Sequence, residues 1–132
     1  MLGDQIGEET GKVIVRRVLP SEGRPKVEVS VQSSGKLLGV ETRSMVTYTA
    51  TVRADGSVYG EGQGLVTGKN GEAAIIIVGG AGRLSGGAVS YRGAVYFESE
   101  SETWKRLNTI AVVYEYEADA DGNARSKSWE WK

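Results

Sequence analysis

Residues 55–97 read DGSVYGEGQGLVTGKNGEAAIIIVGGAGRLSGGAVSYRGAVYF, and this stretch decides the fold. Three alternating segments lie in it, separated by turn signals at Asp55-Gly56, Asn70-Gly71 and Ser85-Gly86-Gly87. Asp-Gly and Asn-Gly supply the positive φ angles of a tight type I′ turn. We therefore predict consecutive β-hairpins through this part of the chain.

Glycine alternates with larger residues along the first of these segments. Gly60, Gly62 and Gly64 are interleaved with Glu61 and Gln63. Because successive side chains of a strand point to opposite faces, the three glycines share one face. A face without side chains lets a sheet bend sharply, or lets another group approach closely. The pattern predicts a strongly curved antiparallel sheet.

The rest of the chain continues the alternating pattern. We predict further strands at 11–20, 26–33, 37–42 (with a bulge or bend at Gly39), 45–53, 87–99, 107–118 and 125–132. Trp104 lies in a polar connection, and we expect it to fold back as a lid. No segment has a sustained helical period. An open sheet of this size would leave two unpaired edges, and closure removes them.

The predicted fold class is therefore all-β: a closed antiparallel barrel of eight or nine strands, mostly an up-and-down meander, with little or no helix. A two-sheet sandwich is the alternative. At 132 residues the chain is expected to be one domain, 1–132, with residues 1–9 as a flexible polar lead-in.

The composition limits the chemistry. The chain has no cysteine and no histidine, which removes disulfides, thiolate nucleophiles, the commonest general base and the commonest metal ligand. We therefore expect no metal site and no cofactor. Any catalysis would rely on Glu, Asp, Lys, Tyr, Ser or Thr.

The charge pattern argues against two classes of partner. Sixteen basic residues stand against seventeen acidic residues, for a net charge of -1, so we expect no nucleic-acid binding. The N-terminal stretch lacks the apolar region of a secretory signal. The longest apolar run, Ala73–Val78, is too short to cross a bilayer. We expect a cytoplasmic protein without membrane insertion.

Two glycine-punctuated stretches, GSVYGEGQG (56–64) and GAVSYRGAVYF (87–97), are followed by a closing YEYEADADGNARSKSWEWK (114–132). Together they resemble a small microbial family of allene oxide cyclase-like barrels, which are related in architecture to the dirigent proteins. The resemblance spans most of the chain from Lys12. It implies a barrel that holds an apolar or amphipathic small molecule inside, sometimes to cyclise it, and a homo-oligomer.

Three side chains are candidate catalytic groups: Glu61, Tyr96 and Glu115. An inward-facing Glu61 would be a carboxylate in an apolar barrel, able to act as general acid or base. The alternative is that Glu61 faces water and the glycines line the inside, which the usual exposure of charged residues favours. Shifting a strand by one residue would exchange the two faces.

Five side chains are candidate ligand contacts: Gln63, Arg92, Asn108, Tyr48 and Tyr114. An inward Arg92 paired with Glu61 or Glu115 could orient a carboxylate ligand. An outward Arg92 would form an ordinary surface pair. Asn108 suits a ligand contact and a structural hydrogen bond equally. The tyrosines could cradle a ligand, although packing of the core is their commoner use.

Three functions follow as alternatives. The first is a barrel that binds a small apolar or amphipathic molecule. The second is a cofactor-free isomerase or cyclase, in which shape and one buried carboxylate or tyrosine do the chemistry. The third is a structural oligomerisation module with a filled barrel. We favour the first.

Overall fold

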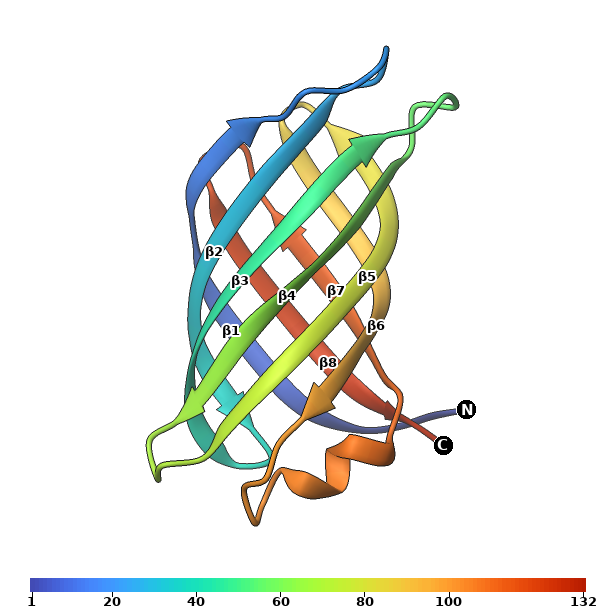
Figure 1. Cartoon of the computed structure of the whole chain (residues 1–132). Helices are drawn as coiled ribbons and strands as arrows, with labels where there is room; N and C mark the ends of the chain where they lie inside the picture. Colours follow the sequence, from blue (N-terminus) through green and yellow to red (C-terminus); the bar gives the residue numbers. More distant parts are fainter.

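Eight antiparallel strands follow one another around a closed barrel in the computed structural model, which describes all residues, Met1–Lys132 (Figure 1). The strands are β1 (Leu2–Val18), β2 (Lys26–Leu37), β3 (Val40–Val52), β4 (Val58–Gly68), β5 (Ala73–Ser85), β6 (Ala88–Glu98), β7 (Val112–Ala118) and β8 (Asn123–Trp131). Strand β1 pairs with both β2 and β8, so no edge is left open. The predicted all-β meander barrel is confirmed.

The hairpin turns depend on left-handed glycines. Gly56 and Gly71 have φ angles of 86° and 92°, but neither Asp55 nor Asn70 has a positive φ. This is the pattern of a type I turn followed by a left-handed glycine. The Asp55 and Asn70 side chains accept hydrogen bonds from the backbone N–H two residues further on, at 2.9 and 3.1 Å. The hairpins are confirmed, but the type I′ geometry predicted at these two pairs is wrong.

Two-residue turns with two positive φ angles occur at Gly86 (58°) and Gly87 (86°), where a turn was predicted, and at Leu38 (49°) and Gly39 (79°). Strand β2 continues through Gly35 to Leu37, and β3 starts at Val40. The predicted separate strand at 37–42 is therefore wrong. Gly39 lies in the turn of the β2–β3 hairpin and does not form a bulge. The number of strands is therefore eight.

Residues 1–9, expected as a lead-in, form the first half of β1 apart from Met1. Gly7 lies opposite Leu37 of β2 and opposite Ser128 of β8. From Gly7 onward this segment has a strand on each side, whereas Leu2 and Gln5 pair with β8 alone. Its backbone groups are paired there, although its outward side chains are polar.

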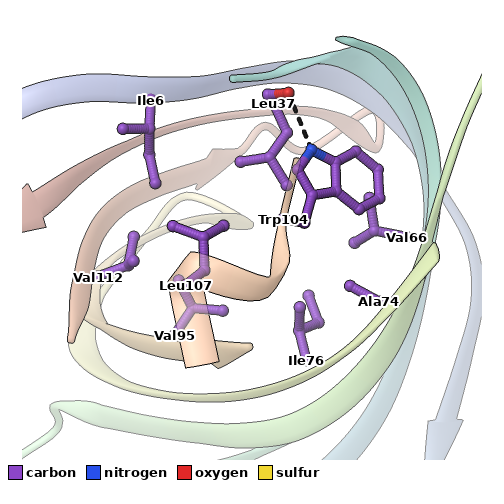
Figure 2. Close-up of a cluster of buried hydrophobic side chains, with 9 residues drawn as sticks. All are labelled: Ile6, Leu37, Val66, Ala74, Ile76, Val95, Trp104, Leu107 and Val112. Carbon is purple, nitrogen blue, oxygen red and sulfur yellow. Dashed lines mark hydrogen bonds between the residues drawn. The ribbon is translucent and has the colours of Figure 1, made fainter. Parts of the chain in front are cut away.

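A short 3₁₀ helix, η1 (Lys105–Thr109), closes one end of the barrel where a strand was predicted from residue 107 (Figure 1). Trp104 and Leu107 are fully buried, and the Trp104 indole Nε1–H donates a 3.2 Å hydrogen bond to the Leu37 carbonyl (Figure 2). Burial of these two side chains across the barrel end accounts for the interruption of the strand pattern. No helix in the structure has the length and apolar character needed to span a membrane.

Inward-facing glycines make room for aromatic rings. A Cβ on Gly60 would lie 3.0 Å from the Tyr91 ring, and a Cβ on Gly80 would lie 2.5 Å from the Tyr114 hydroxyl. A Cβ on Gly62 would come within 2.1 Å of the Thr47 carbonyl on the adjacent strand. These glycines therefore set both the curvature of the wall and the position of the tyrosines inside it.

Candidate binding cavity

A cavity of ≈ 140 Å³ lies inside the barrel. It is lined by members of both hydrophobic clusters, the one around Trp104 and Leu107 at the plugged end and the one around Tyr48 and Tyr91. We call these regions the plug and the tyrosine layer. The cavity occupies the space between them.

The cavity has two chemically different walls. Strands β4, β5 and β6 contribute an apolar wall: Val66, Ile76, Val78, Val95 and Phe97. Strands β8, β1, β2 and β3 contribute a mixed wall, which carries Glu9 and the hydroxyl groups of Ser33, Thr42, Ser44, Ser126 and Ser128 beside the apolar Val31, Leu37 and Val46. The interior is therefore amphipathic.

Glu9 is the acidic group of the mixed wall. Its carboxylate accepts hydrogen bonds from the Thr42 hydroxyl (3.1 Å) and the Ser44 hydroxyl (3.0 Å) on β3. Strand β2 lies between β1 and β3, and its residue in this register is Gly35, opposite both Glu9 and Thr42. Because Gly35 has no side chain, Glu9 can extend across β2 to β3.

The environment of Glu9 acts on its pKa in two opposing ways. Burial raises the pKa of Glu9, and the hydrogen bonds from Ser44 and Thr42 oppose that rise. Glu9 takes part in none of the six ion pairs of the protein. The structure contains no group of three or more carboxylates that could hold a metal ion.

Four tyrosines stand beside the cavity. The rings of Tyr91 and Tyr116 pack edge-on against Tyr48, at centroid distances of 5.7 and 5.8 Å. Burial raises the pKa of all four tyrosines, to about 12 for Tyr114, so they are neutral hydroxyls at physiological pH. The buried Tyr91 hydroxyl has no hydrogen-bond partner within the protein.

Among the residues singled out from the sequence, Tyr48 and Tyr114 line the cavity. Five others lie on the outer surface, because they alternate with inward-facing residues of β4, β6 and β7: Glu61, Gln63, Arg92, Tyr96 and Glu115. Arg92 and Glu115 form an exposed cross-strand ion pair at 3.2 Å, which is the surface alternative considered for Arg92. The structure does not bring these five together with the two tyrosines.

Asn108 lies in η1 and not on a strand. Its amide Nδ2 donates to the Ser99 carbonyl at 2.9 Å, and its Oδ1 accepts from the Ser99 N–H at 2.8 Å. Both polar ends of the amide are therefore used to hold η1 against the end of β6. Asn108 is not among the residues that line the cavity.

Sequence reasoning missed Glu9 and the hydroxyls around it. Glu9 lay within the expected lead-in, Thr42 ended the separate strand predicted at 37–42, and Ser44 lay between that strand and the one predicted at 45–53. The sequence did contain a signal: Gly7, Glu9 and Gly11 are spaced two residues apart, so they share one face of a strand. Gly60, Gly62 and Gly64 have the same spacing in β4. In both strands the glycines occupy the inner face.

The sequence matches no protein-family model and no curated protein. Several solved structures share its fold. A protein of unknown function from Clostridium acetobutylicum superposes with a TM-score of 0.84 at 13% identity, over 96% of each chain. A β-barrel-like protein from Acinetobacter baumannii gives 0.82 at 10% identity, over 100% of this chain and 96% of the other.

A third similar structure is an enzyme from Penicillium herquei, with a TM-score of 0.65 and 12% identity over 98% of this chain and 96% of the other. At these identities the similarity establishes the barrel fold alone.

Proposed function

We propose that the barrel binds a small amphipathic molecule in its interior cavity. The observation that carries this proposal is the pairing of two walls around one cavity, apolar side chains on β4–β6 and Glu9 with neighbouring hydroxyls on β8–β3. Ligand sites typically combine an apolar lining with a few polar groups that fix orientation. Tyr48 and Tyr114, two of the contacts proposed from the sequence, belong to this lining.

The volume limits the size of the ligand. An apolar protein cavity of about 150 Å³ takes up benzene. The cavity here, ≈ 140 Å³, therefore suits one ring with a short substituent. A larger molecule would require movement of the lining side chains.

The polar groups of the cavity also support a ligand. Tyr91 is buried, and its hydroxyl has no partner within the protein. A buried hydroxyl without a partner is costly, so such groups usually find a ligand or water. The Tyr91 ring lines the cavity while its hydroxyl is shielded from the open space, so the Glu9 carboxylate is the polar contact that faces a bound molecule.

Native mass spectrometry of the purified protein would reveal a retained small molecule. Benzyl alcohol, followed by chemical shifts of backbone amides, provides a defined probe. We expect shifts at cavity residues in the wild type and in Ile77→Phe, whose side chain is on the outer face. Val78→Phe fills the cavity and should abolish those shifts. No retained molecule and no shifts at cavity residues in the wild type would refute the proposal.

A cofactor-free isomerase or cyclase is the second candidate, and the resemblance to allene oxide cyclase-like barrels belongs here. The observation in its favour is a carboxyl group of raised pKa that faces a cavity lined by neutral tyrosine hydroxyls. Such a carboxyl could remove and return a proton on a bound molecule. Glu61, Tyr96 and Glu115 lie on the outer face, so we assign to Glu9 the role proposed for them.

The molecule retained in native mass spectrometry would test this second candidate. Incubated with the wild type, it should yield a product of the same mass, and Glu9→Gln should stop the conversion. Unchanged conversion by Glu9→Gln would show that Glu9 is not the acid or base of the reaction.

We also propose that the chain forms a homo-oligomer. Five apolar side chains are exposed on neighbouring strands of one outer face: Met45, Leu65, Ile75, Ile77 and Tyr96. Exposed apolar patches of this kind often mark contacts between proteins. Light scattering should give a multiple of the 14.1 kDa chain mass, which Leu65→Lys with Ile77→Lys reduces to a monomer. A monomeric wild type would exclude this proposal.

A further inference from the structure

We propose that the molecule bound in the cavity is a small amine, whose ammonium group pairs with the carboxylate of Glu9. This inference rests on the proposed binding function and specifies the chemical class of its ligand.

The charge distribution inside the barrel carries the inference. Three charged residues contribute to the lining: Glu8, Glu9 and Lys36. Glu8 and Lys36 are exposed, and each alternates with inward-facing residues of its own strand, so both side chains face outward. Glu9 alone faces inward, and it has no ion-pair partner in the protein. A carboxylate removed from water without a counter-charge is unfavourable.

The hydrogen bonds of Glu9 fit its ionised form. Thr42 donates to one carboxylate oxygen and Ser44 donates to the other. Hydroxyl donation to both oxygens favours the carboxylate. Each oxygen retains a further acceptor site, because a carboxylate has about four lone-pair positions. An ammonium group, which has three donors and no acceptor, can use those remaining positions.

The rest of the cavity suits the organic part of an amine. The apolar wall, which includes Val78 and Phe97, can contact a ring or short alkyl group. The electron-rich faces of Tyr48 and Tyr116, which also line the cavity, attract cations. A carboxylate ligand would instead add a second negative charge beside Glu9, and no side chain of the cavity lining supplies an inward-facing cation. Arg16, opposite Val29, is close enough to Tyr48 and Tyr116 to affect their pKa values, but it is not part of the lining.

Benzylamine, benzyl alcohol and benzoate test the inference, since they share one ring and differ in the charge of one short substituent. Titration calorimetry at neutral pH should rank their affinities for the wild type as amine, then alcohol, then benzoate. Glu9→Gln should weaken benzylamine about 10- to 100-fold, the effect of losing a hydrogen bond to a charged group. It should change benzyl alcohol by less than about threefold, since that probe has no charge.

Glu61→Gln is the matched control, because it makes the same change on the outer surface. It should leave all three affinities unaltered. Benzyl alcohol binding that equals or exceeds benzylamine binding in the wild type would overturn the amine inference and leave the binding function standing. Failure of all three probes to bind would overturn both. Equal losses for amine and alcohol in Glu9→Gln would show a damaged cavity rather than a lost charge pair, and would also overturn the inference.

Discussion

The plug and the middle of the barrel, where the cavity lies, differ in whether their buried polar groups have partners. At the plug, Trp104 and Leu107 are fully buried, and the indole N–H has a partner. In the middle, the Tyr91 hydroxyl has no partner, and Glu9 has no counter-charge. Close packing with satisfied polar groups stabilises a fold, whereas an open space with unsatisfied polar groups favours an added molecule. The difference separates the part of the interior that maintains the barrel from the part that can bind.

The largest expected effect is the removal of the plug. Trp104→Ala deletes a fully buried indole and its hydrogen bond to Leu37, and should lower the free energy of unfolding by about 3–5 kcal/mol. Trp131→Ala is the control, because Trp131 is 55% exposed. It should cost less than about 1 kcal/mol. Urea unfolding measures both variants, and similar losses would contradict the distinction between plug and surface.

A smaller effect is expected where glycine makes room for the tyrosine layer. Gly80→Ala places a Cβ where the Tyr114 hydroxyl lies, at 2.5 Å, and should cost about 1–3 kcal/mol as the ring is displaced. Gly79→Ala adds a Cβ whose only near neighbour is the Tyr59 hydroxyl at 3.5 Å, an ordinary contact. It should be neutral or slightly stabilising, because it restricts the unfolded chain. Equal thermal stabilities of the two variants would show that Tyr114 does not depend on Gly80.

Strand alternation and glycine-containing turns were enough to predict the barrel. Those signals are local, since a period of two and a left-handed glycine depend on a few neighbouring residues. The site was harder because it is assembled from β1 and β3 across β2. No local pattern shows that Glu9 contacts Thr42 and Ser44, which lie 33 and 35 residues away.

The plug was harder for a different reason. The apolar residues of 107–118 alternate as a strand would, and only the open end of a finished barrel favours folding Leu107 inward as part of η1. Asn108 was predicted on the same strand, and its place in η1 gives it the structural hydrogen bonds that were one of its two alternatives. Tertiary burial outweighed a local strand preference at this one place.

The contribution of Glu9 to the pH dependence of stability sharpens the contrast, because Glu9 is the one carboxyl whose pKa is raised by burial, whereas the pKa values of the surface carboxyls Asp55, Glu117 and Asp119 are lowered. Burial raises the pKa of Glu9 above its ordinary value of 4.5, so the folded protein holds this proton more tightly than the unfolded chain does. The resulting stabilisation is fully present below pH 4.5 and is lost as the pH rises through the raised pKa. Each pKa unit corresponds to about 1.4 kcal/mol.

The Glu9→Gln variant has no carboxyl group at this position and therefore no titration there. Its free energy of unfolding should therefore rise relative to that of the wild type as the pH increases through this window. Urea titrations of both proteins at several pH values would measure the change. Parallel curves would mean that Glu9 is as well solvated in the folded barrel as in the unfolded chain.

The smallest effect is expected on the outer wall, at Arg92 and Glu115. Their side chains are 69% and 45% exposed, and a salt bridge of this kind contributes about 0.2–1 kcal/mol. A double-mutant cycle with Arg92→Ala and Glu115→Ala should give a coupling energy in that range, reduced by added salt. Neither substitution should alter benzyl alcohol binding, because neither residue lines the cavity. A marked loss of binding in either variant would place the site on the outer face of the barrel. Strand alternation alone does not determine which of the two faces is the interior.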